Sequence, residues 1–346
     1  MTTSYRRILK NSSIIGGASV ANIAIGLVRT KFLALLLGPF GLGFASLYSG
    51  FLNMAGTVAT MGLGTVGTRQ IAEAYGNEDP HILVVVRRAM FWGTAFLSLS
   101  AMLVIWLMRG FLANHVLGSA SLSHAIGWLA VGVGFLVAAA SQSALLQGTY
   151  RVGDLARVTV YGSLFNAGLG ILLLWRWNMN GLIGYVLVGP IATFVLGHFY
   201  VARLPKIKDD TTHLREIMRE WRDLLRMGVA YVGAGLATTF TQLWIRIFVG
   251  QSLGNAPLGQ YQAAWTVSMY YVSFVLTAMA TDYYPRLTGV IHDHEAARRL
   301  VNEQTEVALL LSTPIFVAMM ATAPWAMHLL YSALFGPSIA ILRWQI

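Results

Sequence analysis

The sequence predicts an all-α, polytopic membrane protein made of two lobes that are related by an internal repeat. The first observation is composition: 56% of the 346 residues are hydrophobic and 11% are charged, against about 25% charged residues in an average soluble domain. The second is the arrangement of the apolar residues in long blocks, since Met90–Met108 and Trp128–Tyr150 contain no charged residue. About 20 such residues are enough to cross the hydrocarbon core of a bilayer.

The apolar blocks predict nine complete membrane spans and the beginning of a tenth. Each block is bounded by polar, charged or glycine-rich residues, which places its ends at the membrane surfaces. The predicted spans cover residues 12–37, 43–67, 84–108, 123–147, 155–176, 181–202, 224–250, 258–282, 302–323 and 338 onward.

The basic residues orient these spans. With the N-terminus in the cytoplasm, the outer ends carry only Arg109, Arg176 and Arg343, and three more basic residues lie inside spans. The other 18 of the 24 basic residues then lie at cytoplasmic ends, which is a strong positive-inside signal. This asymmetry accounts for the net charge of +10, and we therefore expect no nucleic-acid partner.

One long polar stretch divides the chain. Residues 203–223 carry apolar residues at helical spacing among many charges, a pattern typical of an amphipathic helix lying at a membrane surface. The predicted domains are therefore an N-terminal six-helix lobe at 1–202, a cytoplasmic linker at 203–223 and an incomplete C-terminal lobe at 224–346.

An internal repeat is the third observation behind the fold prediction. Short matches recur at a nearly constant spacing along the chain, as sequence repeats do. They relate Leu37–Gly43 to Leu253–Gly259, Arg69 to Arg286, and Trp128 to Trp344. Six spans separate the lobes, so both enter from the same side, which predicts a parallel repeat about an axis along the membrane normal.

The repeat also predicts where the second lobe is cut. The first lobe continues from Trp128 to about residue 202, whereas the chain ends at Ile346, almost directly after Trp344. We therefore expect the chain to stop inside its tenth helix, and a complete protein to have two more spans and to end near residue 418, about one repeat length after residue 202.

With these features the sequence resembles the Wzx-type O-antigen and polysaccharide flippases of the multidrug/oligosaccharidyl-lipid/polysaccharide exporter (MOP) superfamily, which also contains the MATE transporters. The resemblance extends over essentially the whole chain, in short motifs. They are Gly26–Ala34 with Leu37–Gly43, Thr68–Ala72, Tyr284–Thr288 and Leu342–Gln345.

This resemblance implies a twelve-helix protein of two six-helix lobes around a central cavity, in the bacterial cytoplasmic (inner) membrane. It implies transport of an undecaprenyl-pyrophosphate-linked oligosaccharide, an O-antigen or other polysaccharide repeat unit, to the periplasmic leaflet by alternating access. The implied partners are the lipid-linked oligosaccharide, membrane lipids and the polysaccharide polymerase machinery of the same pathway.

The charged residues inside spans are the main candidates for substrate binding. A charge at the centre of a span costs roughly 2.5–3.5 kcal/mol on insertion scales and usually faces a cavity. Arg29 and Arg246 are related by the repeat, so they are expected to face each other, and two guanidinium groups suit a pyrophosphate. Lys31 lies about 200° around the helix from Arg29. Each of the three could instead extend to lipid headgroups.

Aromatic and uncharged polar residues are the second group of candidates. Tyr48 and Trp265 are also related by the repeat and could stack on sugar rings, although aromatic residues near span ends commonly form an interfacial belt. Asn22 and Gln242 could contact glycan hydroxyl groups, although hydrogen bonding between helices is at least as common a use.

The sequence predicts no cofactor, no metal and no enzyme. The GxGxxG pattern at Gly62–Gly67 ends a predicted membrane helix, whereas a dinucleotide site needs a preceding strand. The acids and histidines of His292–Glu295 are explained by a solvated turn with helix-capping carboxylates, and the chain has no cysteine.

Three alternative functions remain open at this stage. A cation-coupled multidrug antiporter of the same superfamily would need a membrane-buried acid, for which Asp154 and Asp282 are the nearest candidates. A polytopic polymerase or ligase would need a large outer loop, and the longest predicted outer connection is only Arg109–Leu122. A scaffold role would leave the arginines inside spans unexplained.

Overall fold

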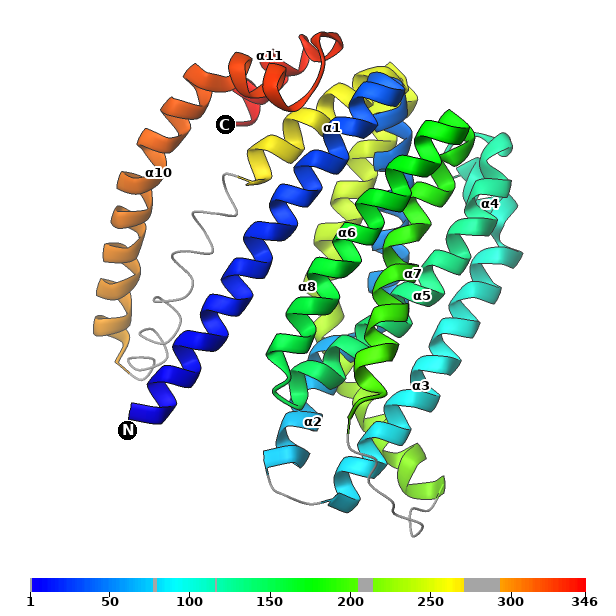
Figure 1. Ribbon diagram of the computed structural model, residues 1–346, viewed down its shortest axis with the longest axis vertical. Coiled ribbons are helices and arrows are strands. Elements are labelled where there is room, and N and C mark those ends of the chain that lie inside the picture. Colours follow the sequence, from blue (N-terminus) through cyan, green and yellow to red (C-terminus); the bar gives the residue numbers. More distant parts are fainter. Residues whose placement is uncertain (1, 77–79, 116, 205–213, 271–292) are drawn as a thin grey trace.

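The computed structural model describes residues 2–76, 80–115, 117–204, 214–270 and 293–346. Over these residues it is a bundle of long helices (Figure 1). The helices are α1 (Thr2–Thr60), α2 (Leu63–Gly76), α3 (Pro80–Leu107), α4 (Arg109–His115), α5 (Ser123–Gly148), α6 (Val152–Trp177), α7 (Leu182–Val201), α8 (Leu214–Leu253), α10 (His294–Leu330) and α11 (Ser338–Gln345), with short 3₁₀ turns η1 (Ala120–Leu122), η2 (Asn178–Gly181) and η3 (Ala333–Phe335). Residues 255–270 are also helical. The all-α prediction is therefore confirmed.

The helices are long and apolar enough to cross a membrane several times. In the described residues, five segments are long and apolar enough to span a membrane, or six if the bent helix α8 counts as one span. Two of them, Ile14–Thr60 and Val152–Val201, contain 47 and 50 residues, which is enough for two passes each. The chain is thus a multi-pass membrane protein.

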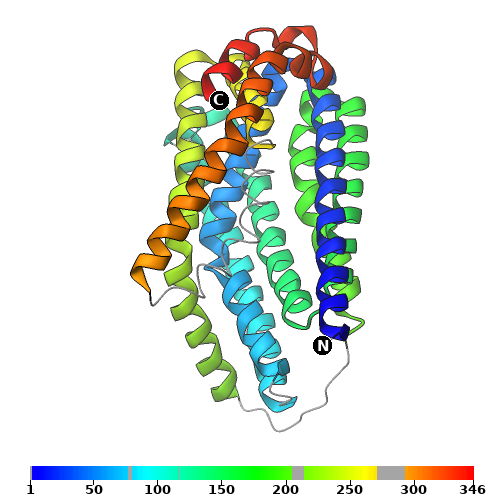
Figure 2. The same ribbon diagram turned by 90° about the vertical axis from the view of Figure 1, so that its left-hand side faces the viewer.

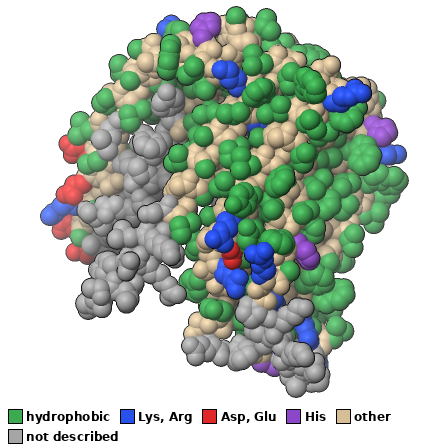
Figure 3. Space-filling model, in the orientation of Figure 1, with side chains coloured by type: hydrophobic (Ala, Val, Ile, Leu, Met, Phe, Trp, Pro, Cys, Tyr) green, Lys and Arg blue, Asp and Glu red, His purple; other side chains and the backbone are tan. Residues whose placement is uncertain are grey.

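The surface supports the same conclusion. Large apolar side chains are exposed along the helices, among them Phe91, Leu99 and Trp175, each with about two thirds of its surface accessible. Hydrophobic side chains dominate the middle of the visible face, and the acidic ones lie on the early part of α10 and near the turn between α5 and α6 (Figure 3). Such a surface is suited to lipid, because an exposed apolar face of this extent is rare in water.

A kink divides α1 into two antiparallel arms that correspond to the first two predicted spans. Gly38 has φ 62° and ψ −164°, a conformation that glycine adopts without a steric penalty. Pro39 follows, and its ring and missing N–H group prevent the helix from continuing straight. The first arm rises from the N-terminus to the kink, and the second arm runs back in roughly the opposite direction, set apart from the first (Figure 2).

The second predicted span ends earlier than expected. It was predicted to reach residue 67, but α1 ends at Thr60 and α2 begins at Leu63. Met61 and Gly62 between them both have positive φ, 45° and 71°. The glycine-rich sequence therefore contains a helix break, which the uniform hydrophobicity of the segment does not reveal.

Helix α5 lies at the centre of the helices formed by residues 2–201. Ile126, Leu129 and Val133 are each completely buried, and the helix contacts α2, α3 and α7. Helices α1, α6 and α7 pack against each other beside it, and α8 packs against α1 and α3. The described part of α10 contacts α1, η3 and α11.

The second half of the predicted linker is helical in the structure. Residues 205–213 lie outside the described residues, but Leu214–Asp223 forms the first turns of α8. There Trp221 packs directly against Gly93 of α3, and Glu216 lies 3.7 Å from His81. Helix α8 bends by 49° between Gly233 and Gly235. The division into 1–202, 203–223 and 224–346 stays a prediction.

The glycines of the repeated motif meet in space. A Cβ atom on Gly43 would lie 3.2 Å from the backbone nitrogen of Gly259, and one on Gly259 would lie 3.0 Å from that of Gly43. These two residues are equivalent in the repeat, because each closes its copy of the motif. Equivalent positions that contact each other reciprocally are what a twofold axis between two lobes produces.

Candidate functional site

A polar cavity of about 230 Å³ lies between the two arms of α1, helices α7 and α8, and residues 255–270. Its lining includes both arginines that the repeat relates, Arg29 and Arg246. The full lining, which we call the arginine cavity, is Arg29, Thr30, Leu33, Leu42, Ala45, Ser46, Ser49, Asn53, Tyr185, Arg246, Gln262 and Thr266. Among the described residues, no acidic side chain belongs to this lining.

Local packing holds Arg29 in place. Its guanidinium carbon lies 4.7 Å from the centre of the Tyr185 ring, which is within the range of a cation–π interaction. Tyr185 is only 2% exposed, so its ring is fixed by the core on its other side. The arginine thus keeps its charge inside the bundle without a carboxylate partner among the described residues of the cavity.

Arg246 is held by a different group. Its Nε donates to the Gln262 side-chain oxygen at 3.0 Å, and the Gln262 amide nitrogen donates to the Thr266 hydroxyl at 3.1 Å. Gly50 makes room for the arginine, because a Cβ atom there would lie 2.8 Å from Arg246 Nη1. One edge of the guanidinium is therefore anchored, and a guanidinium has further N–H groups that can donate to a ligand in the cavity.

The second arm of α1 supplies uncharged polar groups. Ser46, Ser49 and Asn53 follow each other at intervals of three and four residues, so they lie on one face of the helix. The Ser46 hydroxyl donates to the Gly43 carbonyl oxygen at 2.7 Å. A cavity with two cations and several hydroxyl and amide groups can bind an anion that also carries hydrogen-bonding groups.

The other predicted site residues do not line the arginine cavity in the described part of the chain. Tyr48 is 6% exposed and packs against Phe44, and Trp265 stacks on Tyr261 with ring centres 6.1 Å apart. Lys31, Asn22 and Gln242 are all half-buried. The binding roles of these five residues stay predictions.

Several cavity residues were missed by sequence reasoning. Tyr185, Gln262 and Thr266 come from parts of the chain far from Arg29, and no local pattern marks them. Ser46, Ser49 and Asn53, in contrast, form a polar stripe at helical spacing within an apolar span. This stripe could have identified the three residues from the sequence as candidates for lining a polar cavity.

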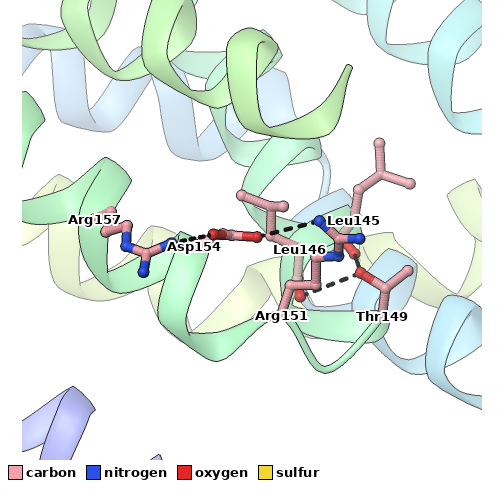
Figure 4. A network of polar contacts seen from close by, with 6 residues as sticks. All are labelled: Leu145, Leu146, Thr149, Arg151, Asp154 and Arg157. Atoms are coloured by element: carbon pink, nitrogen blue, oxygen red, sulfur yellow. Dashed lines mark hydrogen bonds and ion pairs between the residues drawn. The ribbon is translucent and has the colours of Figure 1, made fainter. Parts of the chain in front are cut away.

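Asp154, one of the two acids named as candidates for ion coupling, does not line the arginine cavity. Asp154 is in the first turn of α6, where its two oxygens accept from Arg151 Nη1 at 3.4 Å and from Arg157 Nη1 at 2.9 Å (Figure 4). Asp282 lies outside the described residues. Asp293, from the predicted solvated turn, caps the N-terminus of α10. Its carboxylate accepts from the backbone N–H groups of Glu295 and Ala296 at 3.0 Å.

Comparisons with known proteins identify the fold and the family. Residues 32–340 match the family described as polysaccharide biosynthesis protein. No curated protein sequence matches the chain significantly.

Three solved transporters illustrate the structural similarity. An inward-facing multidrug resistance MATE family transporter of the MOP superfamily has 16% identity and a TM-score of 0.75, over 93% of this chain and 76% of that one. A MOP superfamily transporter from Pyrococcus furiosus, described as having a binding pocket of reverse polarity, has 17% identity and a TM-score of 0.66, over 97% and 77%. A eukaryotic MATE transporter has 13% identity and a TM-score of 0.65, over 98% and 78%.

The family match covers most of the chain, and the similar structures share its fold. The chain therefore belongs to the polysaccharide biosynthesis protein family, and its multi-pass helical fold is that of the MATE and MOP superfamily transporters.

Proposed function

We propose that this transporter is a flippase for undecaprenyl-pyrophosphate-linked oligosaccharides, which it moves across the bacterial cytoplasmic membrane. The observation that carries the proposal is the arginine cavity, where Arg29 and Arg246 line one intramembrane space together with hydroxyl and amide groups. Arginine binds phosphate oxygens through two parallel N–H groups. The polar groups suit sugar hydroxyls near the pyrophosphate.

The proposed mechanism is alternating access. The pyrophosphate enters the arginine cavity while most of the hydrocarbon chain stays in lipid, and the two lobes then rock to open the cavity to the periplasm. The N-terminus lies in the cytoplasm in this proposal, as the distribution of basic residues indicates. The polysaccharide polymerase machinery of the same pathway is the proposed recipient of the flipped substrate.

The second candidate function is a cation-coupled multidrug antiporter, which the similarity of fold to multidrug transporters brings into consideration. The lining of the arginine cavity favours the flippase, because its described residues include two cations and no acid. A cationic drug would be repelled there. The Pyrococcus furiosus relative, described as having a binding pocket of reverse polarity, supports the idea that pocket charge varies within this fold.

Transport in proteoliposomes tests the proposal directly. The purified protein is reconstituted, a fluorescent undecaprenyl-pyrophosphate oligosaccharide is incorporated, and movement between leaflets is followed by quenching from outside. We expect the protein to accelerate this movement over protein-free vesicles. Failure to move the lipid, together with uptake of a cationic dye driven by an ion gradient, would replace the flippase by the antiporter.

Substitution of Asp154 provides an independent test of the antiporter. Because its carboxylate is engaged by two arginines at the start of α6, Asp154→Asn should lower stability by only about 0.5–1 kcal/mol. We expect the substitution to change the transport barrier by less than about 0.5 kcal/mol. The transport rate should therefore remain within about twofold of the wild-type rate. Loss of ion-driven transport with unchanged stability would show instead that Asp154 couples transport to an ion.

A further inference from the structure

A second cavity, almost wholly apolar, lies beside the arginine cavity. Its volume is about 460 Å³, and it lies between residues 51–61 at the end of α1, residues 97–112 of α3 and α4, and Leu243 of α8. We call it the apolar groove. Of the described residues that line it, Ser100 is the only polar one. A water-filled site would need two to four polar partners for each water, so this space is suited to hydrocarbon.

The groove is elongated. Phe51 and Val58 on α1 are seven residues apart, and Leu97 and Met108 are eleven residues apart along α3 and its end, so at about 1.5 Å per residue the walls run for about 10 to 16 Å. Its volume is about three times that of an apolar cavity of roughly 150 Å³, which holds one benzene molecule. Such a shape fits a flexible chain better than a compact ligand.

The groove opens toward lipid. Three of its lining residues keep a large accessible surface, with 45% of Val58, 51% of Val104 and 44% of Met108 accessible. Leu103, next to Val104, is exposed as well. A hydrocarbon chain can therefore enter from the bilayer without crossing a polar surface.

The groove and the arginine cavity meet at Gly50. A Cβ atom on Gly50 would lie 2.8 Å from Arg246 Nη1 and 3.2 Å from Leu243 Cδ1. Leu243 lines the groove and Arg246 lines the cavity, and the two are three residues apart on the same face of α8. An amphiphile bound to Arg246 through its anionic group thus has an adjacent place for its chain.

We propose that the apolar groove binds the polyprenyl chain of the transported lipid, in the segment next to the pyrophosphate. This inference rests on the proposed function and adds the site that recognises the lipid part of the substrate. Ser46, Ser49 and Asn53 on one face of α1 then contact the polar part, whereas residues on another face, from Phe51 to Val58, contact the chain.

The groove orients the chain more than it anchors it. Lipid tails are as apolar as leucine side chains, so transfer from bilayer to groove gains little hydrophobic free energy. What the groove adds is packing and a fixed direction, which hold the pyrophosphate beside Arg246 during the conformational change. Its loss should therefore slow transport several-fold and not abolish it.

Filling the groove tests this role. Ala101→Trp places a large ring in the groove from α3, and Val58→Trp does so from the opposite wall. The matched control is Leu103→Trp, which adds the same ring two residues away on the lipid-facing side of α3. Thermal unfolding in detergent shows whether each variant is folded.

Transport is measured with one pyrophosphate oligosaccharide on either an undecaprenyl or a short geranyl chain. We expect Ala101→Trp to slow the undecaprenyl substrate by about fivefold, or roughly 1 kcal/mol, and to leave the geranyl substrate at the wild-type rate. Equal slowing of both substrates, or of neither, in folded variants would overturn the groove assignment.

Photocrosslinking separates this inference from the proposed function. Undecaprenyl pyrophosphate without sugar, carrying a diazirine in its first isoprene units, should label peptides that contain Phe51–Met61 and Leu97–Met108, and Ala101→Trp should reduce this labelling. Labelling there by a protein that flips neither substrate would retain the groove and reject the flippase. Labelling spread evenly over lipid-facing helices would reject the groove even if transport is observed.

Discussion

Replacing Arg246 by alanine should reduce transport of the undecaprenyl-pyrophosphate oligosaccharide by about 10- to 100-fold, because hydrogen bonds to a charged group contribute about 1.5–3 kcal/mol. Arg246 lines the arginine cavity, and Gln262 holds one edge of its guanidinium at 3.0 Å. Its charge is thereby presented to the cavity in a fixed orientation. Initial rates in proteoliposomes at equal amounts of folded protein give the measurement.

Two further variants identify the cause of that loss. Arg246→Lys keeps the charge but not the planar pair of donors, so it should restore only part of the rate. Arg176→Ala removes an exposed arginine at the end of α6 and should transport normally. Equal rates for Arg246→Ala and the wild-type protein would exclude Arg246 as a phosphate ligand.

Arg29→Ala should also reduce transport, by an amount comparable to Arg246→Ala, if both arginines hold the same pyrophosphate. The two changes should then combine less than additively, because residues that act on one ligand are energetically coupled. The double variant measured beside the two single variants gives this coupling. Fully additive losses would indicate that the two arginines act at separate steps.

The repeat made the arginine pair predictable from the sequence. A charge inside an apolar span is conspicuous, and the repeat relates Arg29 to Arg246 in the same register as Arg69 to Arg286. The structure places Arg29 and Arg246 in one cavity. In the same way, the first span was predicted to end at residue 37, and Gly38 is the site of the kink in α1.

The remaining cavity residues depend on tertiary packing, which a single sequence does not encode in any local pattern. Gln262 is one uncharged polar residue among many, and its role follows only from its contact with Arg246. Tyr48 has the same repeat relationship as the arginines, yet it is buried against Phe44. Equivalent positions in two lobes share a place in the fold, but their side chains need not face the same space.

The close contact between the repeated glycines leads to the largest expected effect on stability. A Cβ atom on Gly43 would overlap the backbone carbonyl oxygen of Asn255, and one on Gly259 would overlap that of Pro39. Neither clash can be relieved by rotating a side chain, because both partners are backbone atoms. Separating the helices would instead open the contact between the two lobes.

Gly43→Ala should therefore lower the free energy of unfolding by about 3 kcal/mol, the upper part of the range for overpacked sites. Gly168→Ala is the matched control: Gly168 lies in α6 with no other described atom within 4 Å of its Cβ position, so alanine there should be neutral or stabilising by about 0.5–1 kcal/mol. Thermal unfolding of the purified variants in detergent gives the comparison. If Gly43→Ala unfolded at the wild-type temperature, the two lobes could not be in backbone contact at this point, and the pseudo-twofold axis would have to pass elsewhere.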